Sequence, residues 1–171
     1  MPDKNNSNPT LVIKLKDGEV KITLFKDLAP NHVQRISQLA KEGKYNNVVF
    51  HRVIDGFMAQ TGDIKYGNLS SNFDMSLAGT GGSSMPDLGA EFNKMSFERG
   101  SLGMARAQDP DSANSQFFIM FQEGSFLNGQ YTLFGQVIEG MTYVDNIKRG
   151  DESNNGLVSN PDHMIEVIYH D

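Results

Sequence analysis

The chain has 171 residues and a net charge of −6, with 38% hydrophobic and 21% charged residues. This length suits one domain that buries a core without cross-links, and the lack of cysteine excludes disulfides, thiolate nucleophiles and cysteine-based metal sites. The acidic balance disfavours nucleic-acid binding, and no apolar run approaches the roughly 20 residues of a membrane span. The first residues also lack the apolar stretch of a secretory signal. We therefore expect no nucleic-acid or membrane partner and a cytoplasmic location.

The amino-terminal part of the sequence predicts a short tail followed by a β-hairpin. Residues 1–9 are polar with proline near both ends, which predicts a disordered tail and leaves 10–171 as the folded domain. Between Leu11 and Leu24, apolar residues alternate on both sides of Asp17-Gly18. Since Asp-Gly tolerates the positive φ of tight turns, this pattern predicts two antiparallel strands.

The rest of the chain combines two helical patterns with short apolar runs. Apolar residues at helical spacing predict helices over 33–40 and 141–148. Short apolar runs separated by turn-rich stretches predict strands over 48–54, 57–61, 102–105, 117–121, 133–138 and 164–169. This inventory predicts a mainly β fold, a closed antiparallel barrel with helices over its ends. The polar stretch 63–88 is expected to wrap the surface or border a site.

One stretch near the carboxyl end resembles a calcium loop. Asp151, Ser153, Asn155, Gly156 and Asp162 stand at template positions 1, 3, 5, 6 and 12. Asp162 is shorter than the bidentate glutamate of that template, and the residues after it read as a strand and not as a second helix. A polar turn with capping side chains is therefore the favoured interpretation.

Other catalytic patterns are incomplete. The glycine-rich run at 79–84 lacks the Gly-Lys-Ser/Thr ending of a phosphate-binding loop, so we interpret it as a flexible loop. The four histidines form no metal-binding pair at helical spacing. Ser112 and Ser115 lack the Gly-x-Ser-x-Gly elbow of a hydrolase nucleophile. We predict no metal and no cofactor.

His51 and Arg52 are adjacent in an apolar run. Strand alternation predicts side chains on opposite faces, with His51 packed and hydrogen-bonded. Arg52 alone reads as an ordinary surface charge on a strand. Its sequence neighbours suggest more, since Phe57 and Met58 offer apolar walls, Gln60 an amide and Arg52 a rigid planar cation.

Three segments in order carry these features: FHRVIDGFMAQTGD at 50–63, LGMARAQDPDSANSQFFIMF at 102–121 and SFLNGQYTLFGQV at 125–137. With these motifs the chain resembles the cyclophilin family of peptidyl-prolyl cis–trans isomerases, over nearly all of Leu11 to Tyr169. Its compact loops and Tyr131 are most similar to bacterial members.

The resemblance implies a fold, an activity and a site. The fold is an eight-stranded antiparallel barrel closed by two helices. The activity is rotation about X-Pro bonds of proline-containing peptides and of unfolded or nascent proteins, by a monomer without cofactor. Arg52 would be the principal catalytic residue, supported by Gln60. The substrate-binding residues would be Phe57, Met58, Ala105, Arg106, Gln116, Phe118, Phe126, Leu127 and Tyr131.

Three positions depart from the pattern of many members. Phe126 stands in place of a tryptophan whose N–H helps to hold cyclosporin, so we expect weak binding of that drug. Tyr131 replaces a histidine but keeps a ring with a polar tip. Arg106 replaces an asparagine that contacts the peptide through its backbone, so catalysis should tolerate the change.

Two further interpretations stay open. The groove could grip proline-containing loops as a chaperone or scaffold, or the barrel could serve another ligand. The presence of Arg52 favours an enzyme, because binding alone does not require a cation beside the pocket.

Overall fold

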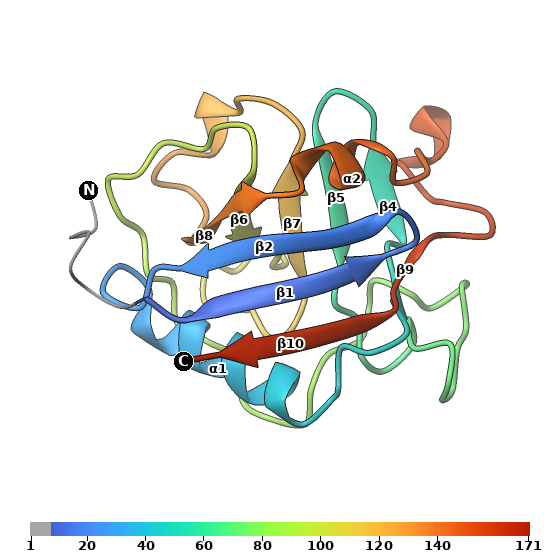
Figure 1. Ribbon diagram of the computed structural model, residues 1–171, viewed down its shortest axis with the longest axis horizontal. Coiled ribbons are helices and arrows are strands. Elements are labelled where there is room, and N and C mark those ends of the chain that lie inside the picture. Colours follow the sequence, from blue (N-terminus) through green and yellow to red (C-terminus); the bar gives the residue numbers. More distant parts are fainter. Residues whose placement is uncertain (1–7) are drawn as a thin grey trace.

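The fold is that of a computed structural model, which describes residues 8–171. Eight strands form one antiparallel sheet in the order β10-β1-β2-β8-β6-β7-β5-β4, and β3 pairs with β9 separately (Figure 1). The strands are β1 Thr10–Leu15, β2 Gly18–Leu24, β3 Val48–Val49, β4 Arg52–Ile54, β5 Met58–Thr61, β6 Ser101–Met104, β7 Phe117–Met120, β8 Leu133–Glu139, β9 His163–Met164 and β10 Glu166–His170. The helices are α1 Pro30–Lys41 and α2 Met141–Asp145, with single 3₁₀ turns at Ser125–Leu127 and Glu152–Asn154.

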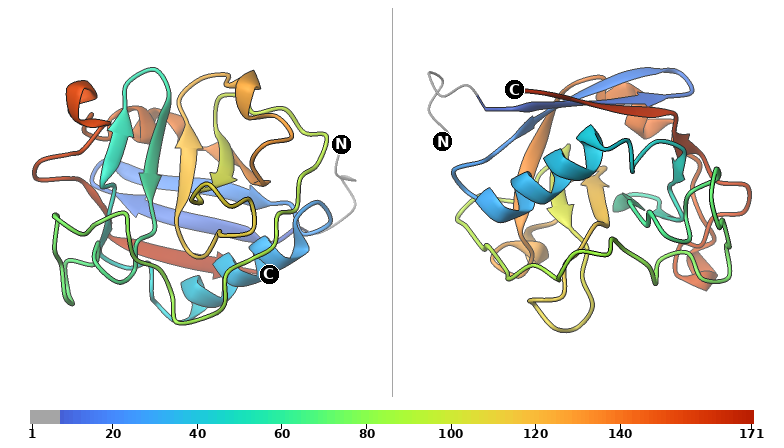
Figure 2. Two further views of the ribbon diagram at one scale, coloured as in Figure 1. Left: turned by 180° about the vertical axis from the view of Figure 1, so that it is seen from behind. Right: turned by 90° about the horizontal axis from the view of Figure 1, so that it is seen from below.

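The sheet curls into a half-barrel that hydrogen bonds do not close, so the prediction of a closed barrel is wrong in this respect. The physical reason lies at the two edge strands. The outer edge of β4 is occupied by a turn, because Val53 N–H donates to the Gly156 carbonyl and its own carbonyl accepts from Gly150 N–H, both at 2.8 Å. At the other edge, Val167 N–H of β10 donates to Asn46 Oδ1 at 2.9 Å, and helix α1 packs against the same strand (Figure 2). Each edge is therefore covered by something other than the opposite edge.

The predicted hairpin and helices are present with modest changes. Strands β1 and β2 form the predicted hairpin, but they pair from Thr10–Thr23 to Leu15–Gly18, so the two turn residues are Lys16 and Asp17 and neither Asp17 nor Gly18 has the expected positive φ. Helix α2 ends at Asp145, three residues short of the predicted end. The run predicted as one strand over 48–54 is two strands, because β3 pairs with β9, whereas β4 pairs with β5 in the main sheet.

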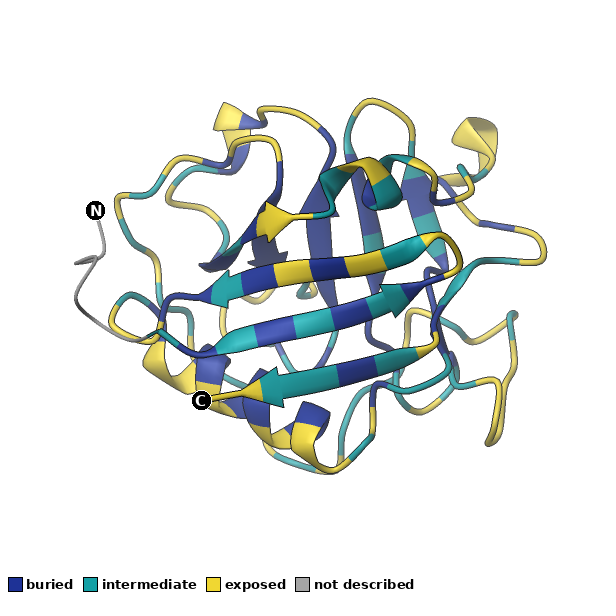
Figure 3. Ribbon diagram, viewed as in Figure 1, coloured by how far each residue is buried: buried dark blue, intermediate teal, exposed yellow. Residues whose placement is uncertain are grey.

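The two faces of the half-barrel bury different side chains (Figure 3). The main core lies inside, where the alternate residues of β1 and β2 are buried. Strands β6 and β7 are buried along their whole length. Their outer faces contribute to a second apolar cluster, whose buried members are Phe25, Met58, Phe97, Phe118, Met120, Leu127 and Leu133. This outer cluster supports the site described below.

Most of the predicted tail lies in residues 1–7, outside the described residues. Near its end, the Pro9 carbonyl already accepts a 3.0 Å hydrogen bond from Leu24 N–H. Within residues 8–171, no helix is both long and apolar enough to cross a membrane.

Candidate active site

Four residues form a row across neighbouring strands on the outer face of the sheet. Arg52 on β4 is opposite Gln60 on β5, and Gln60 is opposite Phe118 on β7. Phe118 is in turn opposite Gly103 on β6. Because adjacent strands are about 4.8 Å apart, this register places a cation, an amide and an aromatic ring side by side. Residues far apart in the sequence are thus brought together by strand pairing alone.

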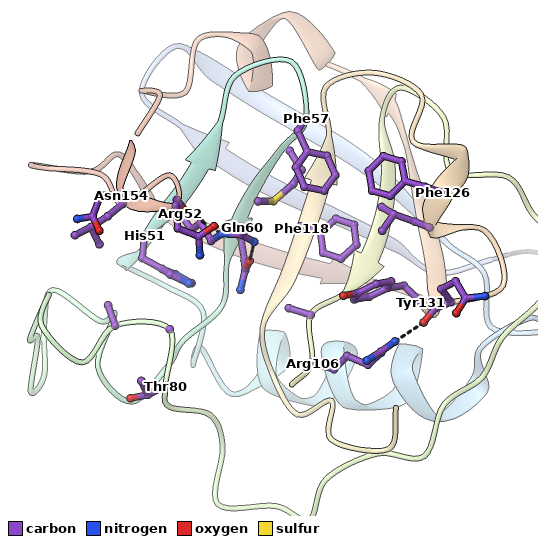
Figure 4. A pocket seen from close by; sticks show the side chains of 18 residues that line it. His51, Arg52, Phe57, Gln60, Thr80, Arg106, Phe118, Phe126, Tyr131 and Asn154 are labelled. Carbon is purple, nitrogen blue, oxygen red and sulfur yellow. Dashed lines mark hydrogen bonds between the residues drawn. The ribbon is translucent and has the colours of Figure 1, made fainter. Parts of the chain in front are cut away.

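A cavity of about 900 Å³ opens over this row (Figure 4). All of the predicted site residues line it except Gln116, which lines an adjoining cavity and hydrogen-bonds to Gln60. The lining residues that were predicted are Arg52, Phe57, Met58, Gln60, Ala105, Arg106, Phe118, Phe126, Leu127 and Tyr131. The sequence therefore predicted residues that the fold does bring together.

The apolar part of the cavity has a buried floor and aromatic walls. Met58, Phe118 and Leu127 are almost fully buried. The Tyr131 ring meets Phe118 edge-on with centroids 6.0 Å apart, and Phe126 lies 5.5 Å from Phe57 at the rim. Phe126 is 68% exposed, so its ring is available to a ligand at the mouth of the cavity. This part of the cavity suits a compact apolar ring.

Gly103 determines where the Phe118 ring lies. A Cβ atom at this position would be 2.4 Å from Phe118 Cζ and 2.6 Å from Phe97 Cε1, closer than such atoms approach. The two rings stack with centroids 6.0 Å apart across the space that a side chain would fill. The floor of the cavity thus depends on a glycine in β6.

The Arg52 guanidinium is fixed at the polar end of the cavity by two residues. Its Nε–H donates to the Asn155 carbonyl at 3.0 Å, and Nη2–H donates to Asn155 Oδ1 at 3.1 Å. Nη1–H donates to Gln60 Oε1 at 3.0 Å. Burial lowers the pKa of Arg52 from its usual value. No carboxylate of residues 8–171 forms an ion pair with it.

The orientation of the Gln60 amide is itself determined by its neighbours. Gln60 Nε2–H donates to Gln116 Oε1 at 3.0 Å, and Gln116 Nε2–H donates to the carbonyls of Gly79 and Gly81 at 2.9 Å each. Because those two carbonyls only accept, the Gln116 oxygen must face Gln60 and the Gln60 oxygen must face Arg52.

The glycine-rich run at 79–84, which we interpreted as a flexible loop, is anchored through its backbone N–H groups and through its backbone carbonyls. The N–H groups of Gly79 and Gly81 donate to Asp63 Oδ2 at 2.7 and 3.0 Å, and their carbonyls bind Gln116. Asp63 is fully buried, and its other oxygen accepts from the N–H groups of Lys65 and Tyr66. This part of 63–88 does border the site, because Ala78 to Thr80 line the cavity.

His51 departs from the sequence prediction in two ways. It lies between β3 and β4 and not within a strand, so its side chain and that of Arg52 line the same cavity. Its ring is buried, as expected, but neither nitrogen has a hydrogen-bond partner among the described residues. Burial lowers the pKa of His51 to about 4. The ring is therefore neutral at pH 7.

Arg106 borders the groove and also holds its wall. Its guanidinium lies 4.3 Å from the centre of the Tyr131 ring, and Nη2–H donates to the Gln130 carbonyl at 2.7 Å. Its Nη1 donates to the carbonyls of Ala107 and Gln108. These contacts connect the segment after β6 with the loop that carries Tyr131.

The structure adds residues that the sequence analysis missed, chiefly Asn155 and Leu157 beside Arg52. Asn155 was considered only as part of the calcium template. In the structure the Asp162 carboxylate instead accepts hydrogen bonds from Lys16 Nζ at 2.9 Å and from Lys148 N–H at 2.8 Å. Among residues 8–171, no three histidine or acidic side chains are grouped so that they could hold a metal. The polar-turn interpretation of this segment is confirmed by the capping of Ser153 N–H by Asp151.

Comparison with known proteins gives one consistent family. The model of the family described as "Cyclophilin type peptidyl-prolyl cis-trans isomerase/CLD" matches residues 10–168. A probable peptidyl-prolyl cis–trans isomerase of Brucella suis is 60% identical over 158 residues, which cover 92% of this chain and 81% of the relative. Peptidyl-prolyl cis–trans isomerase B of Escherichia coli is 35% identical over 162 residues, which cover 88% of this chain and 93% of that relative.

Solved structures agree with this assignment. A cyclophilin-type isomerase of Cryptosporidium parvum, crystallised in the presence of the dipeptide Ala-Pro, superposes with a TM-score of 0.78 at 28% identity. The match covers 95% of this chain and 99% of that one. With a family model and relatives that span nearly the whole domain, and with a cavity built from the family's three motifs, the chain belongs to the cyclophilin-type peptidyl-prolyl cis–trans isomerases.

Proposed function

We propose that Arg52 is the catalytic group of this isomerase and that the apolar part of the cavity holds the proline ring. The observation that supports this most is the position of the guanidinium, fixed at the border of an apolar pocket by Asn155 and Gln60. A guanidinium has five N–H groups. The bonds to those two residues use three of them, which leaves one N–H on each terminal nitrogen for the substrate.

The chemistry of rotation explains why a cation is useful there. The X-Pro amide meets a barrier of about 18–20 kcal/mol because its resonance must be broken. As the amide twists, the prolyl nitrogen regains a lone pair and becomes a better hydrogen-bond acceptor. A guanidinium directed at this nitrogen stabilises the twisted state more than the planar state, and this difference lowers the barrier.

Typical free energies indicate how much of the rate acceleration comes from the cation and how much from the pocket. A charge-assisted hydrogen bond contributes about 1.5–3 kcal/mol, and about 1.4 kcal/mol corresponds to a tenfold change in rate. Arg52 therefore accounts for one or two decades of acceleration. The remainder comes from Met58, Phe118 and Leu127, which hold the ring and exclude water that stabilises the more polar planar amide.

We propose proline-containing segments of peptides and of unfolded or nascent proteins as substrates. The open cavity of about 900 Å³ accommodates a proline with its flanking residues. The Cryptosporidium parvum relative was crystallised with Ala-Pro, which supports an X-Pro unit as the element that is recognised. Chaperone-like binding, a monomeric state and a cytoplasmic location stay predictions, testable by aggregation assays, sedimentation and cell fractionation.

Exchange spectroscopy by NMR on an Ala-Pro peptide tests the assignment, since it measures cis–trans exchange without a coupled protease. We expect the wild-type protein to accelerate exchange and Arg52→Ala to lower kcat/KM by about a decade or more. Arg99→Ala is the matched control, because Arg99 pairs with Asp145 on the surface and does not line the cavity. Equal rates for wild type and Arg52→Ala would contradict the role of Arg52.

A further inference from the structure

The turn that carries Asn155 is docked against the catalytic strand. Gly156, the next residue, accepts from Val53 N–H at 2.8 Å and has a φ of +81°. A Cβ atom at Gly156 would lie 2.7 Å from Ile54 Cγ1 and 3.4 Å from Arg52 Cγ. The backbone of this turn therefore approaches β4 as closely as a glycine permits. This contact fixes the distance between Asn155 and Arg52.

Asn155 adopts a backbone conformation that few residues accept. Its φ is +55° and its ψ is +31°, the left-handed region that asparagine tolerates better than most residues. The preceding 3₁₀ turn, Glu152–Asn154, is held by Asp151, whose Oδ1 accepts from Ser153 N–H at 3.0 Å and from Ser153 Oγ at 2.6 Å. In this conformation, the main-chain carbonyl and the side-chain oxygen of Asn155 both accept from the guanidinium.

We propose that Asn155 is the positioning residue that directs the Arg52 guanidinium at the bound X-Pro amide. The two oxygens of Asn155 bind the Nε–H and Nη2–H groups along one edge of the guanidinium, so the plane cannot rotate without breaking a hydrogen bond. Gln60 binds the third position, and its own orientation is determined by Gln116 and the carbonyls of Gly79 and Gly81. The cation is thus held from two sides, by the turn that carries Asn155 and by Gln60 on β5.

This role rests on the catalytic function proposed for Arg52 and goes beyond it. The two Asn155 oxygens bind one edge of the guanidinium and the Gln60 oxygen binds Nη1. The one unused N–H group on each terminal nitrogen is therefore held in a fixed direction before substrate arrives. Such preorganisation benefits the twisted state, because no reorganisation is needed as the lone pair develops. A loss of orientation should consequently lower kcat, whereas KM depends mainly on the apolar pocket and should change little.

The test uses three single variants of the full chain. Asn155→Gly keeps the positive φ and the main-chain carbonyl but removes Oδ1. Asn155→Asp keeps an oxygen at that position. Asn160→Gly is the matched control, because Asn160 is also a left-handed asparagine, with φ +50°, yet it is exposed and does not line the cavity.

Two readouts separate positioning from simple stability. The first is kcat and KM for an Ala-Pro peptide, and the second is the rate at which the Arg52 guanidinium rotates about its Nε–Cζ bond, measured by ¹⁵N NMR. In Asn155→Gly we expect the Arg52 guanidinium to rotate faster than in wild type. We also expect kcat to fall by about fivefold or more, with KM within about twofold of wild type. In Asn155→Asp the guanidinium should rotate slowly, as in wild type. Asn160→Gly should match wild type in both the kinetics and the rotation rate.

Three results would overturn the inference: unchanged rotation and kcat in Asn155→Gly, an equal loss in Asn160→Gly, or rotation in Asn155→Asp as fast as in Asn155→Gly. Failure of the proposed function itself looks different. In that case Arg52→Ala would retain full activity, while the rotation rate would still show whether Asn155 orients the guanidinium.

Discussion

Arg52 and Gln60 face each other across β4 and β5, and the Gln60 side-chain oxygen accepts a 3.0 Å hydrogen bond from Nη1 of the arginine. The glutamine is a neutral acceptor, so it fixes the direction of the cation without neutralising it. An acidic residue at the same place would form an ion pair and reduce the positive charge available to the substrate. The pairing therefore explains why an amide suits this position.

Arg52→Lys should restore little of the activity lost in Arg52→Ala. A lysine ammonium is a point charge on a flexible stem and lacks the planar fork that binds Asn155 and Gln60 together. We expect kcat/KM of both variants to be lower than wild type by about a decade or more, with thermal midpoints nearly unchanged. A lysine variant with wild-type turnover in the peptide assay would show that charge alone is sufficient.

Gly103→Ala should displace the Phe118 ring and weaken turnover. The Cβ atom of the new methyl group would lie 2.4 Å from Phe118 Cζ and 2.6 Å from Phe97 Cε1, so it would overlap both rings. Overpacking of this kind costs about 1–3 kcal/mol of unfolding free energy, and the displaced ring would enter the space for proline and raise KM. Urea unfolding and peptide kinetics measure the two effects.

Gly89→Ala is the control for that substitution, since a Cβ there would meet only Asp111 Oδ1, at 3.8 Å. It should leave both the free energy of unfolding and the kinetics unchanged. If Gly103→Ala behaved like this control, the glycine would not determine the position of Phe118.

The buried His51 should make the protein less stable in mild acid. Its pKa falls from 6.5 in the unfolded chain to about 4 in the folded one, because burial disfavours the charged ring. Between these values the unfolded state binds more protons, so stability falls as the pH decreases from 6.5 towards 4. At pH 5 this linkage lowers the free energy of unfolding by about 2 kcal/mol relative to neutral pH.

His51→Gln removes the titrating group and should reduce the difference in unfolding free energy between pH 7 and pH 5. Burial also lowers the pKa of His32, so some acid sensitivity of the same sign should remain in the variant. Urea unfolding of both proteins at the two pH values makes the comparison. An identical pH dependence in wild type and variant would contradict the linkage.

Cyclosporin should inhibit this isomerase weakly, and Phe126→Trp should tighten its binding. The Phe126 ring lies exposed at the rim beside Phe57 and offers packing but no hydrogen-bond donor. Without an indole N–H at this position, a carbonyl of the drug is buried with no hydrogen-bond donor. This costs about 1–3 kcal/mol of binding free energy, or about one to two decades in dissociation constant. Peptide kcat/KM should change only modestly, because the proline pocket is untouched.

Titration of cyclosporin into wild type and into Phe126→Trp, with the same peptide substrate, gives the two inhibition constants. Equal constants would show that Phe126 does not determine drug affinity.

Local patterns predicted most of the fold because each strand and helix is short and clearly delimited. The alternation on both sides of Asp17-Gly18 predicted the β1–β2 hairpin and its buried face, although the turn itself lies at Lys16-Asp17 and the pairing is shifted accordingly. The closed barrel was wrong because closure depends on what occupies the edges of β4 and β10, and such long-range contacts leave no periodic signal. The break at Phe50 and His51 likewise depends on distant partners, the carbonyl of Asp162 and the N–H of Val158.

The candidate site was predicted where its residues belong to the three motifs and missed where they do not. Asn155 lies 103 residues from Arg52, and nothing local in its polar turn indicates that its oxygens bind a guanidinium. The unpartnered ring of His51 was missed for a related reason, since strand alternation assumed a continuous strand. Both depend on tertiary contacts that a single sequence does not display.

The placement of the site on the outside of the curled sheet separates two kinds of constraint by residue parity. On β5, Ala59 and Thr61 are buried towards the core, whereas Met58 and Gln60 face the cavity. Substitutions of Ala59 or Thr61 therefore affect the main core, substitutions of Gln60 affect the cavity, and Met58 serves both, because it is also a buried member of the outer cluster. New substrate preferences are thus acquired most easily at outward positions that remain partly exposed, while the buried residues on both faces keep the scaffold intact.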